Sequence, residues 1–182
     1  YYYAMTSVEK MAQVLGKQSR VSWITERKDR LYAAFNAVLW TDNGYRSPSR
    51  TAPDDRGNAL AVLAGLTSDE KIPAVMKVLT STFNSSPYME KYVLEAMCVA
   101  GHAEEARTRM LQRYHAMLTY EYVAGESYST LWELWDRTGG TMNHAWSGGP
   151  MVVMSKYILG VRPIGAAYES FRLAPALGSL SS

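Results

Sequence analysis

Several features that would define a function at once are missing from this chain of 182 residues. Its single cysteine, Cys98, excludes an intrachain disulfide and leaves the redox compartment undetermined. No apolar run reaches 18 residues, so we expect no membrane-spanning segment. The formal net charge is only +2 and the basic residues are scattered, so nucleic acid is not an expected partner either.

Motifs for metal, nucleotide and serine-nucleophile chemistry are also missing. His102 and His115 have no cysteine or second histidine at a spacing that suits a metal ion. Gly139 and Gly140 are not followed by the lysine and hydroxyl residue of a phosphate-binding loop. Ser147 lies in "WSGGP" and not in the Gly-x-Ser-x-Gly pattern of a nucleophile elbow. We therefore expect no metal and no cofactor.

What the chain does have is helical periodicity. Apolar residues recur at the spacing of one helix face, as in the set Val8, Met11, Ala12 and Leu15. Residues 84–102 and 150–160 each place a proline early and a glycine at the end, which is typical of a helix with defined ends. This pattern predicts helical hairpins packed side by side, as in a bundle, a solenoid or a toroid. Periodicity alone does not choose among these three architectures.

Two segments depart from the helical pattern. Residues 41–58, "TDNGYRSPSRTAPDDRGN", are rich in Gly, Pro, Ser and Asp and predict a long loop. Near the end of the chain, Glu169, Phe171 and Leu173 alternate as one side of a short strand does. We expect a mainly helical domain that ends in a short β segment.

Residues 130–150, "TLWELWDRTGGTMNHAWSGGP", concentrate the aromatic and ionisable side chains, with three of the five tryptophans. Glu133 lies between two indoles, which exclude water and offer flat apolar faces to a sugar ring. Asn143 and His144 supply neutral hydrogen-bonding groups that suit hydroxyls better than phosphates. The combination favours a carbohydrate site, in which the candidate sugar-binding residues are Trp132, Trp135, Asn143, His144 and Trp146.

A second interpretation of the same segment has no catalysis in it. Two tryptophans three residues apart usually pack one helical face into a core, and a glutamate beside a tryptophan is usually solvated. The chain is then a helical-hairpin interaction module with Trp132, Trp135 and Trp146 in its core. Exposure discriminates between the two, because a sugar site needs the Glu133 carboxylate on a concave surface close to His144.

The segment 129–163 resembles the C-terminal part of the catalytic domain of bacterial α-L-rhamnosidases, glycoside hydrolase family 78. Members carry a Thr-(Thr/Leu/Ile)-Trp-Glu-x-Trp motif, then Asn-His after a Gly or Ser stretch. "NALAVLAGLTSDEK" and "YVLEAMCVAGHAEEARTRMLQRYHAML" resemble the later helical hairpins of this family, and "FRLAP" resembles the first strand of a following β-sandwich. The resemblance is close over 129–163 and looser before residue 58.

The resemblance implies an all-α fold, part of an (α/α)6 toroid built from helical hairpins, with a short β segment at the C-terminus. We predict that residues 1–165 form a partial catalytic barrel and that residues 166–182 begin the β segment. The family's general acid lies on an earlier part of the barrel that nothing here matches, so we expect a fragment that is inactive alone. The exposed helix faces of a partial barrel predict self-association, or cover by absent chain.

The resemblance also implies roles for individual residues in an inverting hydrolysis of terminal α-L-rhamnosyl linkages. Glu133 matches the general base, and His144 matches a histidine that contacts rhamnose. Asn143 is expected to orient His144 or to bind a hydroxyl. The expected partner is a rhamnose-containing glycan or glycoside. The parent protein is expected to be bacterial, and its compartment stays undetermined between cytoplasm, periplasm and exterior.

Two alternatives keep the hydrolase class. A uronic acid in place of rhamnose calls for an arginine near the pocket, for which Arg137 is the nearest candidate and Arg162 lies further along the chain. Glu126 and Asp136 are candidates for a substitute general acid, but both lie too near Glu133 in sequence to reach the opposite face of a sugar ring.

Overall fold

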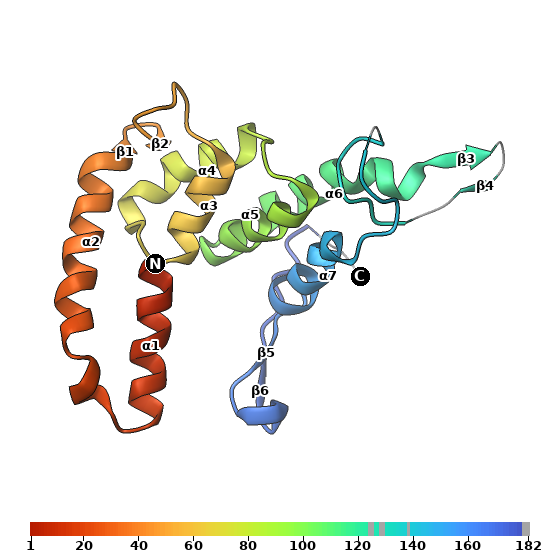
Figure 1. Ribbon diagram of the computed structural model, residues 1–182. Helices are drawn as coiled ribbons and strands as arrows, with labels where there is room; N and C mark the ends of the chain where they lie inside the picture. The colour runs from red at the N-terminus through yellow and green to blue at the C-terminus, as the bar shows by residue number, and fades with distance from the viewer. Residues whose placement is uncertain (124–125, 128–129, 138, 180–182) are drawn as a thin grey trace.

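The computed structural model describes residues 1–123, 126–127, 130–137 and 139–179, which fold into successive helical hairpins (Figure 1). The α-helices are α1 Tyr2–Val14, α2 Trp23–Leu39, α3 Asp55–Leu63, α4 Ile72–Ser81, α5 Pro87–Val99, α6 Ala103–Thr119 and α7 Gly149–Val153. Short 3-10 turns are η1 Gln18–Val21, η2 Asp69–Lys71, η3 Ala145–Gly148 and η5 Ala166–Tyr168, and η4 Met154–Ile158 is a π-helical turn that continues α7. The predicted helical-hairpin fold is confirmed.

Three two-stranded antiparallel ribbons complete the described secondary structure. They pair β1 Trp40–Thr41 with β2 Gly44–Tyr45, β3 Glu121–Val123 with β4 Glu126–Ser127, and β5 Val161–Pro163 with β6 Phe171–Leu173. The first ribbon begins one residue before the predicted long loop, and its second strand β2 lies inside that loop. The third contains the predicted C-terminal strand, in register Val161 to Leu173. Because β5 precedes residue 165 and β6 follows it, this ribbon crosses the predicted domain boundary, which stays a prediction.

Helix α5 occupies the centre of the fold, in contact with α3, α4, α6 and α7. It begins where the Ser86 hydroxyl accepts a hydrogen bond from the Met89 amide, with Pro87 in the first turn. It ends before Gly101, whose φ of +88° closes the helix in a conformation that favours glycine. The start and the end predicted from the sequence are therefore both found.

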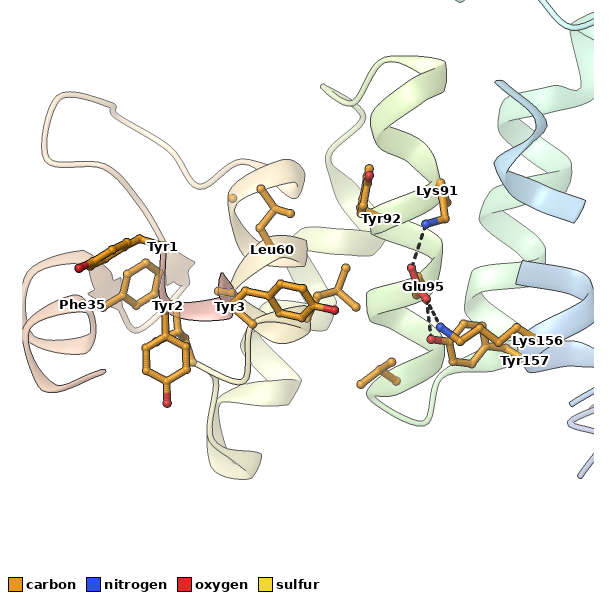
Figure 2. A pocket seen from close by; sticks show the side chains of 16 residues that line it. Tyr1, Tyr2, Tyr3, Phe35, Leu60, Lys91, Tyr92, Glu95, Lys156 and Tyr157 are labelled. Carbon is orange, nitrogen blue, oxygen red and sulfur yellow. Dashed lines mark hydrogen bonds and ion pairs between the residues drawn. The ribbon is translucent and has the colours of Figure 1, made fainter. Parts of the chain in front are cut away.

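Helices from successive hairpins line one cavity of about 790 Å³ (Figure 2). The start of α1 contributes Tyr2 and Tyr3, and α3 contributes Leu60. On the other side Tyr92 comes from α5 and Tyr157 from η4. Apart from Phe35 of α2, the helical lining residues come from α1, α3, α5 and η4. Along the chain these alternate with α2, α4 and α6, so the hairpins present mainly every second helix to a common inner side.

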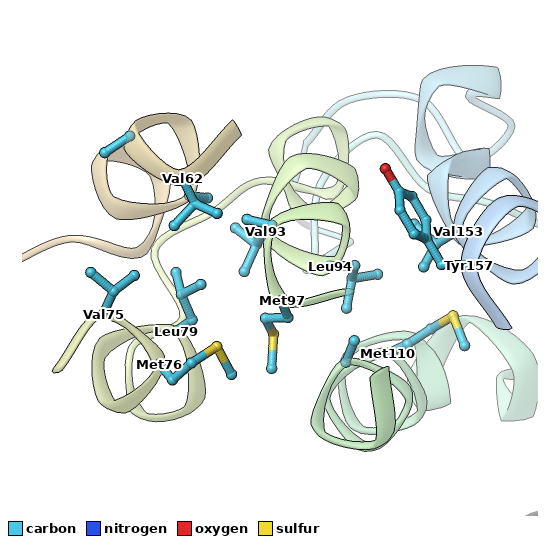
Figure 3. Close-up of a cluster of buried hydrophobic side chains, with 14 of the residues drawn as sticks. Val62, Val75, Met76, Leu79, Val93, Leu94, Met97, Met110, Val153 and Tyr157 are labelled. Carbon is cyan, nitrogen blue, oxygen red and sulfur yellow. The ribbon is translucent and has the colours of Figure 1, made fainter. Parts of the chain in front are cut away.

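The hydrophobic core lies on both sides of α5 (Figure 3). Val93, Leu94 and Met97 of α5 are fully buried. They pack against apolar side chains of the neighbouring helices, among them Val62, Val75, Leu79, Met110, Val153 and Tyr157. Burial over most of α5 matches its largely apolar sequence, although Tyr88 and Val99 near its two ends are exposed.

A buried ionic junction, formed by Asp55, Glu90 and Arg109, joins α3, α5 and α6. The Arg109 guanidinium lies 2.8 Å from Asp55 Oδ2 and 2.6 Å from Glu90 Oε1. Both carboxylates are fully buried and the Arg109 side chain is 3% exposed. Burial alone would lower the pKa of Arg109. The hydrogen bonds and charges of Glu90 and Asp55 outweigh this effect and raise the pKa, so the guanidinium stays charged.

No helix in the described part of the chain combines the length and the apolar character that crossing a membrane requires.

Candidate functional site

The segment from Leu131 to His144 folds back on itself through backbone hydrogen bonds. The Glu133 amide donates to the Thr141 carbonyl at 2.9 Å, and the His144 amide donates to the Leu131 carbonyl at 2.7 Å. In return, the Thr141 amide donates to Glu133 Oε2 at 2.9 Å. These bonds bring Glu133 and His144, eleven positions apart in the sequence, to the same edge of the fold.

Gly140 is required where this segment reverses direction. Its φ is +73°, in the left-handed region that favours glycine. A Cβ atom at this position would lie 3.0 Å from both Cβ and Oε2 of Glu133. A larger residue would therefore strain the turn and push on the Glu133 side chain.

The Glu133 site, as we name it, consists of Glu133, Thr141, His144 and Trp146. Glu133 Oε2 lies 3.5 Å from His144 Nδ1, and the Thr141 hydroxyl lies 2.6 Å from the same nitrogen and 3.3 Å from Glu133 Oε2. The side chains of Glu133 and His144 are 27% and 28% exposed. Trp146 is exposed, and its ring lies 3.9 Å from the His144 ring between centroids. The site therefore offers solvent a carboxylate, an imidazole and an indole face.

The other two tryptophans of the segment pack inward. Trp132 is only 4% exposed and its ring lies 5.6 Å from that of Tyr120. The half-buried Trp135 donates its indole N–H to the Ser85 carbonyl at 2.6 Å, and the Arg113 guanidinium lies 4.0 Å from its ring centroid. The Trp132 ring is buried in the hydrophobic core and therefore does not line an open sugar-binding surface here. The two indoles anchor the segment that carries Glu133.

The sequence did not single out Thr141, and it raised Ser147, which lies beside the site, only as a possible nucleophile. Thr141 bonds both Glu133 and His144, and its only signal was its place between the glycine pair and Asn-His. Ser147 is fully buried and donates its hydroxyl to the Trp132 carbonyl at 2.5 Å, so it holds the segment in place.

The remaining candidates lie around the site. Asn143 and Asp136 are exposed. The side chain of Glu126 lies outside what the structure describes. Of the two arginines considered for a uronic acid, Arg137 stacks on the Tyr120 ring at 3.7 Å and Arg162 on the Tyr157 ring at 4.5 Å. The expected pairing of Asn143 with His144 stays a prediction, whereas Thr141 does contact the imidazole.

Within the described ranges, no group of three or more His, Cys, Asp and Glu side chains is placed to hold a metal ion. Cys98 is half-buried, and burial raises the pKa of its thiol to about 11. This thiol is therefore protonated at neutral pH and a poor nucleophile.

The comparisons with known proteins agree with the fold. A model of the bacterial α-L-rhamnosidase six-hairpin glycosidase domain matches residues 1–158. Among solved structures, a GH78 family rhamnosidase of Bacillus sp. GL1 is similar with a TM-score of 0.70 and 23% identity. The alignment covers 88% of this chain but only 19% of that one. No curated protein sequence matches the chain.

Proposed function

The chain belongs to the bacterial α-L-rhamnosidase six-hairpin glycosidase domain family, and on that basis we propose that it carries the general base of an inverting glycosidase. The proposed reaction is hydrolysis of a terminal α-L-rhamnosyl bond in a glycan or glycoside. Glu133 is the proposed base, and His144 is proposed to bind the rhamnose ring. Asn143, Trp135 and Trp146 remain proposed contacts, and Trp132 supports the segment from the core.

One observation carries the proposal: an accessible carboxylate and an imidazole share one hydroxyl. Glu133 Oε2 and His144 Nδ1 both lie within hydrogen-bond distance of the Thr141 hydroxyl. A hydroxyl accepts and donates at once, so His144 Nδ1–H donates to Thr141 and Thr141 donates to Glu133. In this tautomer Nε2 is left as an acceptor for a sugar hydroxyl. The Glu133 side chain keeps about a quarter of its surface exposed to water.

The chemistry asked of Glu133 is proton removal from a water molecule. In an inverting enzyme that water attacks the anomeric carbon on the face opposite the leaving group, and the base takes its proton. A second carboxylic acid, about 6.5–9.5 Å away, protonates the leaving oxygen. By resemblance to the family, this acid belongs to an earlier part of the barrel. These residues alone are accordingly proposed to be inactive.

The exposed aromatic and aliphatic side chains also support the proposal of a partly completed barrel. Met151 is 70% exposed and Ile164 is 71% exposed. Apolar surface of this kind is unfavourable in water, so we propose that further barrel helices cover it, or that isolated chains self-associate through it.

The burial of Trp132 favours a second candidate, the helical-hairpin interaction module without catalysis. In that case the Glu133 carboxylate performs no chemistry, and its replacement leaves every activity of the full protein unchanged. Replacement of Glu133 alone therefore distinguishes between the two candidate functions.

The experiment is Glu133→Gln in the protein that contains these residues, assayed on an aryl α-L-rhamnoside. Glutamine preserves shape and cannot accept the proton, so kcat should fall about 10²–10⁴-fold with the fold unchanged. Glu26→Gln is the matched control, because Glu26 on α2 is 78% exposed and 3.9 Å from Arg30. Rhamnosidase activity that survives Glu133→Gln would show that another group is the base.

A further inference from the structure

A continuous row of aromatic rings runs from the Glu133 site to the cavity. The Trp146 ring lies 5.5 Å from the Tyr88 ring, which lies 5.8 Å from the Tyr92 ring. Tyr88 and Trp146 are 44% and 45% exposed. We call Trp146, Tyr88 and Tyr92 the aromatic row. It begins in ring contact with His144, and Tyr92 already lines the cavity.

Helix geometry fixes the direction of this row. Tyr88, Tyr92 and Glu95 are spaced by four and three residues, so they lie along one face of α5. From Tyr88 to Glu95 this face extends about 10 Å along the helix axis. The packing of α7 on α5 is close here, because a Cβ atom on Gly149 would lie 2.5 Å from Lys91 Cβ. The row and the segment that carries Trp146 are therefore held together.

The far end of the row is positively charged. Lys156 Nζ lies 2.7 Å from Glu95 Oε1, and Lys91 Nζ lies 3.4 Å from Glu95 Oε2 (Figure 2). Arg162 adds a third cation, with its Nε donating to the Lys156 carbonyl at 3.0 Å. Glu95 is the only carboxylate that lines the cavity among the described residues. We call Lys91, Lys156 and Arg162 the basic cluster.

The single Glu95 carboxylate cannot neutralise three cations. Its carboxylate is 11% exposed and is already bonded by Lys156 and by the Tyr157 hydroxyl at 2.7 Å. The Lys156 side chain is 46% exposed and that of Lys91 is 31% exposed, and both line the cavity. An anion placed here would meet cationic groups held by α5 and η4.

We propose that the aromatic row and the basic cluster form a subsite for the next sugar of the substrate, and that this sugar carries a carboxylate. The inference rests on the proposed function, since it takes the Glu133 site as the position of the rhamnosyl unit. Tyrosine and tryptophan faces suit the C–H patches of pyranose rings. The ammonium group of Lys156 suits the carboxylate of a uronic acid. The preferred substrate is thus a rhamnosyl-uronic acid unit.

The test compares two disaccharides that resist hydrolysis because sulfur replaces the glycosidic oxygen. One joins rhamnose to a uronic acid, and the other joins rhamnose to the corresponding neutral hexose. Titration calorimetry on the full protein at low salt should show at least tenfold tighter binding of the acidic compound. That preference should fall as ionic strength rises, because the ammonium groups are partly exposed.

Three variants sharpen the comparison. Lys156→Gln should bring the two affinities together, whereas Lys77→Gln, on the exposed side of α4, should leave the preference intact. Tyr88→Ala should weaken the binding of both disaccharides, because the ring at the middle of the aromatic row is lost. Thermal melting of each variant checks that the fold is retained.

Equal affinity for the two disaccharides, binding of neither, or a preference that survives Lys156→Gln would overturn the inference. The proposed function is judged separately, by hydrolysis of the aryl rhamnoside. Preferential binding of the acidic compound without that hydrolysis would keep the subsite and reject the rhamnosidase assignment.

Discussion

The buried ionic junction and the Glu133 site use similar side chains for different ends. In the junction, two carboxylates and a guanidinium are almost completely removed from water. At the Glu133 site, a carboxylate and an imidazole are each about a quarter exposed. The junction joins three helices of the core, whereas Glu133, Thr141 and His144 of the site lie on an irregular segment before η3.

The difference shows how burial decides what a carboxylate can do. Glu90 is fully buried among protein donors, so water cannot reach it and its charge serves to hold Arg109 and Arg113. Glu133 Oε2 is held by the amide and hydroxyl of Thr141, which orient the side chain without covering it. A general base needs this second arrangement, because its proton comes from water.

Breaking the junction should have the largest effect on stability. Arg109→Met leaves the buried Asp55 without its cation and leaves Glu90 only the longer contact to Arg113 at 3.5 Å. Loss of one partner of a buried pair costs about 3–5 kcal/mol. The free energy of unfolding, measured by urea titration, should fall by that amount. Arg30→Met is the control: this arginine is 70% exposed, so stability should change by less than about 1 kcal/mol. Equal losses of unfolding free energy in the two variants would contradict the distinction between a buried junction and an exposed ion pair.

Removing the hydroxyl between Glu133 and His144 should have a smaller effect, on catalysis alone. Thr141→Val keeps the backbone amide that bonds Glu133 and removes the shared hydroxyl. We expect kcat of the full protein to fall about tenfold, equivalent to about 1.4 kcal/mol, with little change in unfolding. Thr141→Ser should recover most of the rate. An unchanged kcat in the valine variant would show that the hydroxyl does not orient the base.

The Glu95 side chain, 11% exposed, is intermediate between the buried junction and the Glu133 site. Its replacement should have the smallest effect of the three. Burial alone would raise the pKa of Glu95. The hydrogen bonds from Lys156 and Tyr157 outweigh this effect, so the pKa in the folded protein is below the usual value of 4.5. Such a group adds stability above that pH, and the contribution is lost as pH falls through the folded pKa. The stability difference between the natural protein and Glu95→Gln should therefore shrink between pH 6 and pH 3. A difference that does not depend on pH would contradict this linkage.

Much of the fold could be predicted because its signals are local. Ser86, Pro87 and Gly101 mark the ends of α5 in the sequence and do so in the structure. The partner of Glu90 could not be named, because Arg109 comes from α6 and is brought close only by helix packing.

The candidate site could be predicted in composition but not in orientation. Residues 130–148 have no periodicity that says which side chains face inward. Trp132 and Trp146 therefore looked equivalent, yet one lies in the core and the other is exposed. The link through Thr141 depends on the reversal at Gly140, which brings the 141 amide to Glu133. Such contacts follow from three-dimensional closure and have no spacing rule in the sequence.

The most direct test of the role of Glu133 is chemical rescue of Glu133→Ala in the full protein. The shortened side chain leaves room for azide, an anionic nucleophile that attacks the anomeric carbon without a base. We predict that azide restores turnover of an activated aryl α-L-rhamnoside and yields the glycosyl azide of inverted configuration. No rescue, or a product of retained configuration, would contradict the assignment of Glu133 as the general base.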